Sequence, residues 1–278
     1  MIDALLKSYQ GVVAADTGHI ATHESGAIEF GGHKVLTVPQ KDGKISAQQI
    51  EKLVKDFYDD ANYEHMVMPG MVYISQPTEY GTLYSREELA ALSKVCRENH
   101  LPLYVDGARL AYALASPEND VTLTDLAELS DVFYIGGTKC GALFGEAVVI
   151  PQKGRIPHFF TIIKQHGALL AKGRIAGIQF GELFTDRLYQ RIGKPAMEAA
   201  EQIKAALKKY GYQLSLDTPT NQIFCIVSNE VMKKIAQDVE FGFWEKYDET
   251  HSVIRFATSW ATTMEDTQKL IQILEKNK

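Results

Sequence analysis

The fold is decided by Leu101-Pro-Leu-Tyr-Val-Asp-Gly-Ala-Arg109 and, some twenty residues further on, by Asp131-Val-Phe-Tyr-Ile-Gly-Gly-Thr-Lys-Cys-Gly141. Each stretch is a short apolar run that leads into glycine, as expected of a buried strand that ends in a turn. Asp106 closes the first run and Lys139 follows the second. Because the carboxyl ends of neighbouring parallel strands open into one crevice, we expect these two side chains to lie close together.

An aspartate and a lysine in this arrangement fit pyridoxal 5′-phosphate. The lysine amine forms a Schiff base with the cofactor aldehyde, and the carboxylate keeps the pyridine nitrogen protonated so that the ring accepts electrons. Each signal alone is weak, because Asp-Gly is a common turn and a lysine beside glycines is often a solvated turn residue. The strand context of both favours a cofactor site with Lys139 and Asp106 as catalytic residues.

Working outward, apolar runs alternate with helical patterns through the first two thirds of the chain. Helices are predicted at 45–59 and at 85–100, the second opening with the capping box Ser85-Arg-Glu-Glu88. Such alternation predicts right-handed crossovers and a mostly parallel sheet covered on both faces. The predicted strands are 11–16, 33–39, 71–75, 101–106, 131–136 and 146–150.

After about residue 190 the pattern changes to a small α+β arrangement. The last helix is predicted to open with a capping box at Thr262-Thr-Met-Glu265. We therefore expect a large α/β domain at 1–190 and a C-terminal domain at 191–278. The elements predicted in the second part are helices 195–210, 230–238 and 264–276 and strands 212–216, 222–227, 241–247 and 252–257.

Bulk composition excludes several classes of function. The chain has 278 residues, with 45% apolar and 23% charged residues, which is typical of a soluble globular protein. A net charge of -6 argues against nucleic acid or an anionic membrane as partner, and no apolar run is long enough to span a bilayer. Cys96, Cys140 and Cys225 form neither a disulfide framework nor a zinc pattern, so a cytoplasmic location is expected.

A further motif, Asp16-Thr-Gly-His-Ile-Ala-Thr-His-Glu-Ser-Gly-Ala27, follows the first predicted strand. His19 and His23 are four residues apart and would share a helical face, which suggests a metal site. The order differs from the His-Glu-x-x-His of zinc proteases and no third ligand is apparent, so no metal is expected. Arg109 and Arg255 carry planar guanidinium groups suited to a carboxylate, although an arginine within a strand usually faces solvent.

The segments 103–110, 137–139 and 254–260 resemble the threonine aldolase and β-eliminating lyase family, whose members are fold-type I pyridoxal phosphate enzymes. The resemblance implies an aminotransferase-like fold and a homodimer or homotetramer. It also implies that His19 stacks on the pyridine face and relays a proton. Independently of the resemblance, His23 is expected to be a helix residue that packs or caps nearby. By the same resemblance Arg255 and Arg109 hold the substrate α-carboxylate and the cofactor side of the pocket, so both are expected to bind the substrate and Arg109 also the cofactor.

Two further contacts with the cofactor are expected. Gly136 and Gly137, with Thr138, can supply backbone donors near the phosphate. Gln76 either donates to the phenolic oxygen of the cofactor or is a loop residue, and both interpretations stay open. Its segment, 75–82, departs from the Glu-Asn-Thr-His-like sequence of the family and lacks the histidine linked to substrate discrimination, so the preferred substrate stays open.

The resemblance also implies residues ahead of Met1. Family members carry a terminal arm and a Gly-Gly-Thr-x-Ala-Asn segment at a helix start that binds the cofactor phosphate. Neither is found in this sequence, and residues 1–10 are predicted to be the end of the following helix. The sequence is thus expected to be either a piece of a longer chain or a short form that binds its cofactor weakly.

The expected reaction is retro-aldol cleavage of a β-hydroxy-α-amino acid of the threonine or allo-threonine type, giving glycine and an aldehyde. Two alternatives remain. One is β-elimination from another amino acid, because the fold and the cofactor do not choose the bond that breaks. The other is a cofactor-poor, non-catalytic remnant that serves as a binding or subunit protein.

Overall fold

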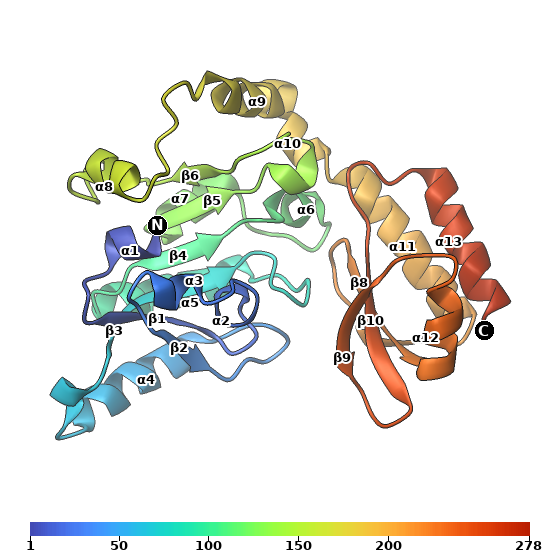
Figure 1. Cartoon of the computed structure of the whole chain (residues 1–278), viewed down its shortest axis with the longest axis horizontal. Helices are drawn as coiled ribbons and strands as arrows, with labels where there is room; N and C mark the ends of the chain where they lie inside the picture. Colours follow the sequence, from blue (N-terminus) through green and yellow to red (C-terminus); the bar gives the residue numbers. More distant parts are fainter.

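The computed structural model describes residues 1–278 as two packed units, each built on one sheet (Figure 1). The first sheet has six strands in the order β2-β1-β3-β4-β5-β6, and the second has four in the order β7-β8-β10-β9. Helix α11 (Lys194–Lys209) leads from one unit to the other. The division into domains at 1–190 and 191–278 stays a proposal.

The first sheet is mostly parallel, as predicted. Its first five strands pair in parallel, and only β6 runs antiparallel, beside β5. From β1 the chain passes to β2 on one side and then crosses to β3 on the other, so the strand order reverses beside β1 and leaves a crevice there. The strands are β1 (Gln10–Ala15), β2 (Val35–Val38), β3 (Met68–Ser75), β4 (Leu103–Asp106), β5 (Val132–Ile135) and β6 (Ala147–Val149).

Helices cover both faces of this sheet. Val13 belongs to a core of 26 buried residues beneath α4, α5, α6 and α7, whereas its neighbour Val12 belongs to a core of 9 on the opposite face, beside α1 and α2. Alternate residues of one strand therefore feed two cores. The helices are α1 (Ile2–Leu5), α2 (His19–Thr22), α3 (Ala27–Phe30), α4 (Ala47–Asp59), α5 (Arg86–Glu98), α6 (Leu110–Ala115), α7 (Leu123–Leu129), α8 (Phe159–Gln165), α9 (Arg174–Phe184) and α10 (Leu188–Arg191). None of the helices in residues 1–278 has the length and apolar character that crossing a membrane requires.

The second sheet is antiparallel throughout and packs on α11, α12 (Asn229–Ile235) and α13 (Met264–Lys276), which confirms the predicted α+β arrangement. The capping box of α5 at Ser85 and Glu88 is also confirmed. The box predicted for the last helix is wrong by one residue. Thr263 and Asp266 form it, because Thr262 instead accepts the Ser259 N–H at 2.8 Å. The strands are β7 (Gln213–Leu216), β8 (Gln222–Ser228), β9 (Gly242–Lys246) and β10 (His251–Ala257).

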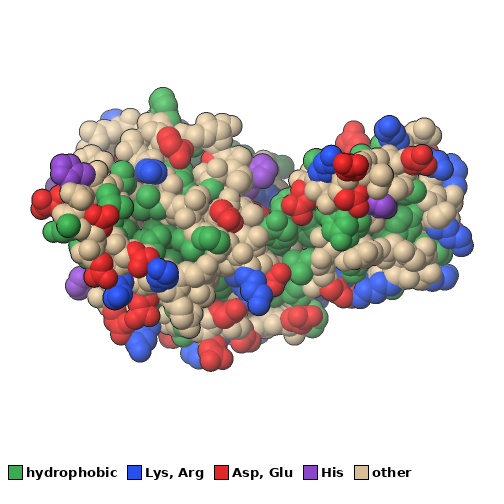
Figure 2. Space-filling model, turned by 90° about the horizontal axis from the view of Figure 1, so that it is seen from below, with side chains coloured by type: hydrophobic (Ala, Val, Ile, Leu, Met, Phe, Trp, Pro, Cys, Tyr) green, Lys and Arg blue, Asp and Glu red, His purple; other side chains and the backbone are tan.

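Hydrogen bonds fasten the two units together beside the crevice. Ser116 Oγ donates to the carbonyl of Pro219 at 2.7 Å, and Thr220 Oγ1 donates to the carbonyl of Gly81 at 2.7 Å. These contacts hold β9 and β10 of the second sheet next to the carboxyl ends of β1, β3 and β4 of the first sheet. Figure 2 shows acidic and basic side chains interspersed over one face of both units.

Candidate active site

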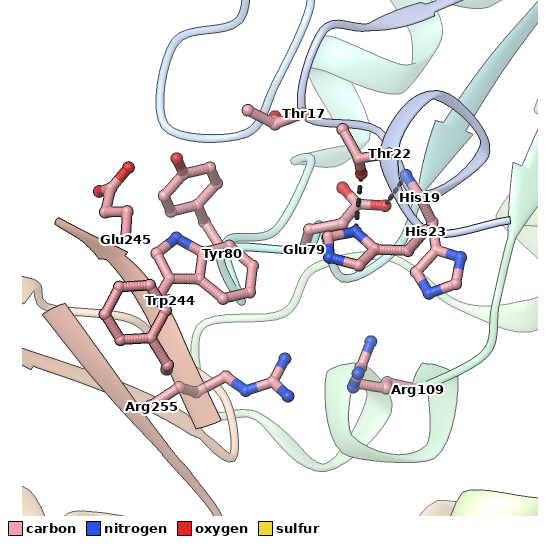
Figure 3. Close-up of a pocket in the computed structure, with 11 residues that line it drawn as sticks. Thr17, His19, Thr22, His23, Glu79, Tyr80, Arg109, Trp244, Glu245 and Arg255 are labelled. Carbon is pink, nitrogen blue, oxygen red and sulfur yellow. Dashed lines mark hydrogen bonds between the residues drawn. The ribbon is translucent and has the colours of Figure 1, made fainter. Parts of the chain in front are cut away.

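A cavity of about 330 Å³ lies where the carboxyl ends of β1, β3 and β4 meet β9 and β10 (Figure 3). Loops after the three parallel strands supply one side, and the antiparallel strands supply the other. Ligands of open α/β sheets bind at such a position. The lining residues are Thr17, His19, Thr22, His23, Glu79, Tyr80, Arg109, Phe243, Trp244, Glu245 and Arg255.

Asp106 ends β4 and is 7% exposed. The backbone N–H of Ala108 donates to its Oδ1 at 2.8 Å, and the Tyr73 hydroxyl donates to its Oδ2. These two donors stabilise a buried carboxylate. The turn that follows requires glycine, because a Cβ on Gly107 would lie 2.0 Å from the carbonyl oxygen of Tyr134.

Lys139 lies in the 3₁₀ turn Thr138–Cys140 that follows β5, next to β4. Its carbonyl accepts the Tyr112 hydroxyl, and that hydroxyl oxygen accepts the N–H of Trp260 at 3.3 Å. The side chain is exposed, yet neighbouring atoms remove part of its hydration and Arg109 repels its charge, and both effects lower the pKa of Lys139. A lowered pKa leaves more of the amine neutral and nucleophilic.

His19 begins α2, and its ring lines the cavity. Its Nδ1 lies 2.7 Å from Glu24 Oε1, and its backbone N–H donates to Glu79 Oε1 at 2.9 Å. His23 also lines the cavity, with its Nδ1 2.7 Å from Thr22 Oγ1. The pairing with Glu24 fixes the orientation of the His19 ring. No group of three or more His, Cys, Asp or Glu side chains in residues 1–278 is arranged to hold a metal ion.

Arg109 and Arg255 share the cavity. Arg255 Nη1 donates to Gln222 Oε1 at 3.2 Å, and its guanidinium carbon lies 5.4 Å from the ring centre of Trp244. Its Nε is buried without a hydrogen-bond partner. Burial and repulsion by Arg109 lower the pKa of Arg255. Two partly buried cations, one with an unused donor, make a site for an anionic group such as a carboxylate.

The backbone donors of Gly136 and Gly137 expected near the phosphate are occupied within the chain, the first by the carbonyl of Gly107 at 2.9 Å. The Gly137 N–H and the Thr138 hydroxyl both donate to the carboxylate of Glu146, the latter at 2.8 Å. Gln76 is fully buried, and its side-chain amide accepts from the N–H of Tyr84 at 2.9 Å and donates to the Tyr84 carbonyl at 3.1 Å. Both ends of this amide are used, which favours the loop interpretation of Gln76 over a contact with the cofactor.

The predicted residues are only partly brought together. His19, Arg109 and Arg255 line one cavity. Asp106 lines a neighbouring cavity with Tyr73 and Glu24, whereas Lys139 lines neither of the two. Sequence reasoning missed Glu79, Tyr80 and Trp244. Glu79 follows a predicted strand end and could have been noticed there, but the two aromatic residues have no pattern that separates them from core residues.

The chain is similar in sequence and in structure to known proteins over most of its length. Residues 1–230 match the model of a family described as beta-eliminating lyase. The low specificity L-threonine aldolase of Pseudomonas aeruginosa is 30% identical over 279 residues, which cover 96% of this chain and 76% of that protein. A solved structure of Leishmania major threonine aldolase is 41% identical, with a TM-score of 0.94 over 99% of this chain and 79% of that one.

More distant structures share the fold alone. A Thermus thermophilus aspartate aminotransferase variant is 14% identical, with a TM-score of 0.72 over 100% of this chain and 76% of its own. The aminotransferase-like, fold-type I architecture predicted from the sequence is thereby confirmed.

Proposed function

This chain belongs to the beta-eliminating lyase family, whose members depend on pyridoxal 5′-phosphate, and we propose that it is a carbon–carbon lyase of the threonine aldolase type. Its substrate is a β-hydroxy-α-amino acid, and its products are glycine and an aldehyde. The observation that carries the proposal is one cavity in which Arg109 and Arg255 accompany the possible proton acceptors His19 and Glu79. A carboxylate and a hydroxyl on adjacent carbons of one small molecule match these two kinds of group.

The residues fit the cofactor. The exposed Lys139 amine, with its lowered pKa, suits an aldehyde, and the doubly hydrogen-bonded Asp106 carboxylate suits a protonated pyridine nitrogen. His19 would lie on a face of the ring, and Arg109 would lie beside it. When bound, the cofactor would withdraw the electrons of the bond that breaks at Cα.

Arg255 would bind the substrate carboxylate. Its guanidinium is held by Gln222 and by the face of Trp244, and its buried Nε–H has no hydrogen-bond partner within the chain. A planar guanidinium that binds both carboxylate oxygens fixes the rotation of the amino acid about its Cα. That fixed rotation orients the Cα–Cβ bond for cleavage, which lowers the entropic part of the barrier.

Oligomeric state and location are further parts of the proposal. We infer a cytoplasmic homodimer or homotetramer, since the family resemblance implies such assemblies and all three cysteines are buried and unpaired. Light scattering coupled to gel filtration tests the assembly, and a mass equal to that of one chain would contradict it.

The function is tested by incubating the purified protein, loaded with pyridoxal 5′-phosphate, with threonine, allo-threonine or phenylserine. We expect glycine and the matching aldehyde in equal amounts. Release of ammonia and a keto acid from serine, cysteine or tyrosine, without aldehyde, would favour β-elimination. A protein that holds the cofactor and does neither would contradict the proposed activity.

A further inference from the structure

Glu79 is a buried carboxylate in the cavity that no motif pointed to. It lies four residues beyond the end of β3 and is 7% exposed. Figure 3 shows its carboxylate directed into the cavity, near His19 and Thr22. Burying a carboxylate costs free energy unless it is bonded or serves a ligand, so its bonding pattern is informative.

One oxygen of Glu79 does the anchoring. Oε1 accepts the Ser75 hydroxyl at 2.7 Å and the His19 N–H at 2.9 Å. Oε2 makes no hydrogen bond with any residue of the chain. A carboxylate oxygen has two acceptor sites. The side chain is therefore held in place through Oε1, and Oε2 is available to a ligand in the cavity.

The charges around Glu79 fit that role. Glu79 counteracts the effect of burial on the pKa of Arg109, so its negative charge lies within electrostatic reach of that guanidinium. Arg255 lines the same cavity. A ligand that spans the cavity meets positive groups at one end and an acceptor oxygen at the other.

The inference rests on the proposed function. A β-hydroxy-α-amino acid brings a carboxylate for Arg255, an amine for the cofactor held by Lys139, and a β-hydroxyl that needs a proton acceptor. The other acceptors in the cavity are less suited. The Nδ1 atoms of His19 and His23 are engaged with Glu24 and Thr22, which leaves only their Nε2 atoms as rival acceptors, and the His19 ring is already assigned to the face of the cofactor. Glu245 is exposed on β9.

We propose that Glu79 is the catalytic residue that accepts the proton of the substrate β-hydroxyl. The proton moves to Glu79 Oε2, and the electron pair of the O–H bond forms the carbonyl of the aldehyde. The Cα–Cβ bond breaks, and its electron pair stays on Cα, which takes up a proton to give glycine, while Glu79 releases the proton that it accepted. The sum is one amino acid converted to glycine and an aldehyde, with no oxidant or reductant. His19 is left free to face the ring.

The test is Glu79→Gln in the cofactor-loaded enzyme, read out by two reactions. Aldehyde release from threonine requires the β-hydroxyl proton to leave, whereas exchange of the α-hydrogen of glycine in D₂O does not involve a hydroxyl. We expect aldehyde release to fall at least ~100-fold, the size of a general-base contribution. Glycine exchange and cofactor affinity should stay within about threefold, since the charge and not the anchoring is removed.

Four outcomes would overturn the inference. Unchanged aldehyde release excludes Glu79 as the acceptor. An equal fall in cleavage and exchange shows a structural role, acting through His19. Lack of aldehyde from the wild-type protein defeats the proposed function itself, and the inference with it. Glu79→Asp, which keeps the carboxylate, should retain more cleavage than Glu79→Gln, and should they be equally inactive the inference also fails. Glu87→Gln, an exposed change on α5, controls for the loss of one charge.

Discussion

The Tyr73 hydroxyl donates a hydrogen bond to the carboxylate of Asp106 from the neighbouring strand β3. In the register of β3 and β4, Ser75 pairs with Asp106, so Tyr73 lies two residues away on the same face of the sheet. Burial and the charge of Asp106 raise the pKa of Tyr73 far above its usual value. The phenol therefore stays protonated, and the carboxylate is oriented before any ligand binds.

Tyr73→Phe should weaken binding of pyridoxal 5′-phosphate about tenfold, because a hydrogen bond to a charged group is worth roughly 1.5–3 kcal/mol and part of it is recovered by water. The dissociation constant is measured by absorbance titration. Tyr104→Phe is the matched control, since Tyr104 is buried in the same cluster, 5.3 Å from the Tyr73 ring, and its hydroxyl makes no hydrogen bond within the chain. An equal loss of cofactor affinity in both variants would show that the packing of these rings, and not the hydrogen bond from Tyr73 to Asp106, determines the affinity.

Lys139 should carry the covalent pyridoxyl group after borohydride reduction. Since its pKa is lowered, the neutral amine is populated from a lower pH than in an ordinary lysine, and labelling should reach half its maximal rate at a pH below that of N-acetyl-lysine methylamide. Peptide mapping by mass spectrometry identifies the labelled residue. A label on another lysine, with Lys139→Ala still reacting, would contradict the assignment.

Arg255→Lys keeps the charge but loses the planar pair of donors, so we expect kcat/KM for threonine to fall at least ~10-fold, mostly through a higher KM. The absorbance of the bound cofactor should not change. Steady-state kinetics over a range of threonine concentrations give kcat and KM separately for the variant and the wild-type protein. Arg174→Lys on the exposed face of α9 is the control. An unchanged KM would show that Arg255 does not bind the substrate carboxylate.

Glu146→Gln removes a negative charge from the donors of Gly137 and Thr138. If these donors serve the phosphate, the variant should bind pyridoxal 5′-phosphate at least ~3-fold more tightly at low salt, because the repulsion of a dianion is relieved. Binding of pyridoxal, which has no phosphate, should change little. Should both ligands bind as before, Glu146 is a structural cap of this turn and the phosphate is bound elsewhere.

Much of the fold was predictable because its strands are buried on both faces and form continuous apolar runs, as in β4. The placement of Asp106 at the end of β4 and of Lys139 after β5 was predictable for the same reason, whereas their role at the site stays a prediction. Helices α8 and α9 were not predicted. α9 contains Gly177 and Gly181 and buries only Leu183, so it has little apolar periodicity.

The parts of the site that escaped prediction depend on register and on contacts between distant segments. Tyr73 belongs to an apolar run and is indistinguishable in sequence from a core aromatic residue, because its bond to Asp106 exists only in one pairing of β3 with β4. Gln76 was ambiguous because a loop amide gives no sign of the backbone it will bind. Trp244 reaches Arg255 only because the second sheet folds over the first.

The Tyr112 hydroxyl bridges the carbonyl of Lys139 and the N–H of Trp260 and so keeps this tryptophan beside the lysine, which matters for the fluorescence of the protein. The chain contains two tryptophans, and both lie at the site: Trp244 under Arg255, and Trp260 beside the lysine turn. All indole emission of the molecule therefore originates within a short distance of the place where a coloured aldehyde would be held. Intrinsic tryptophan fluorescence should therefore be quenched when the protein is titrated with pyridoxal 5′-phosphate. The quenching would report occupancy of the cofactor site without any label, assay enzyme or turnover.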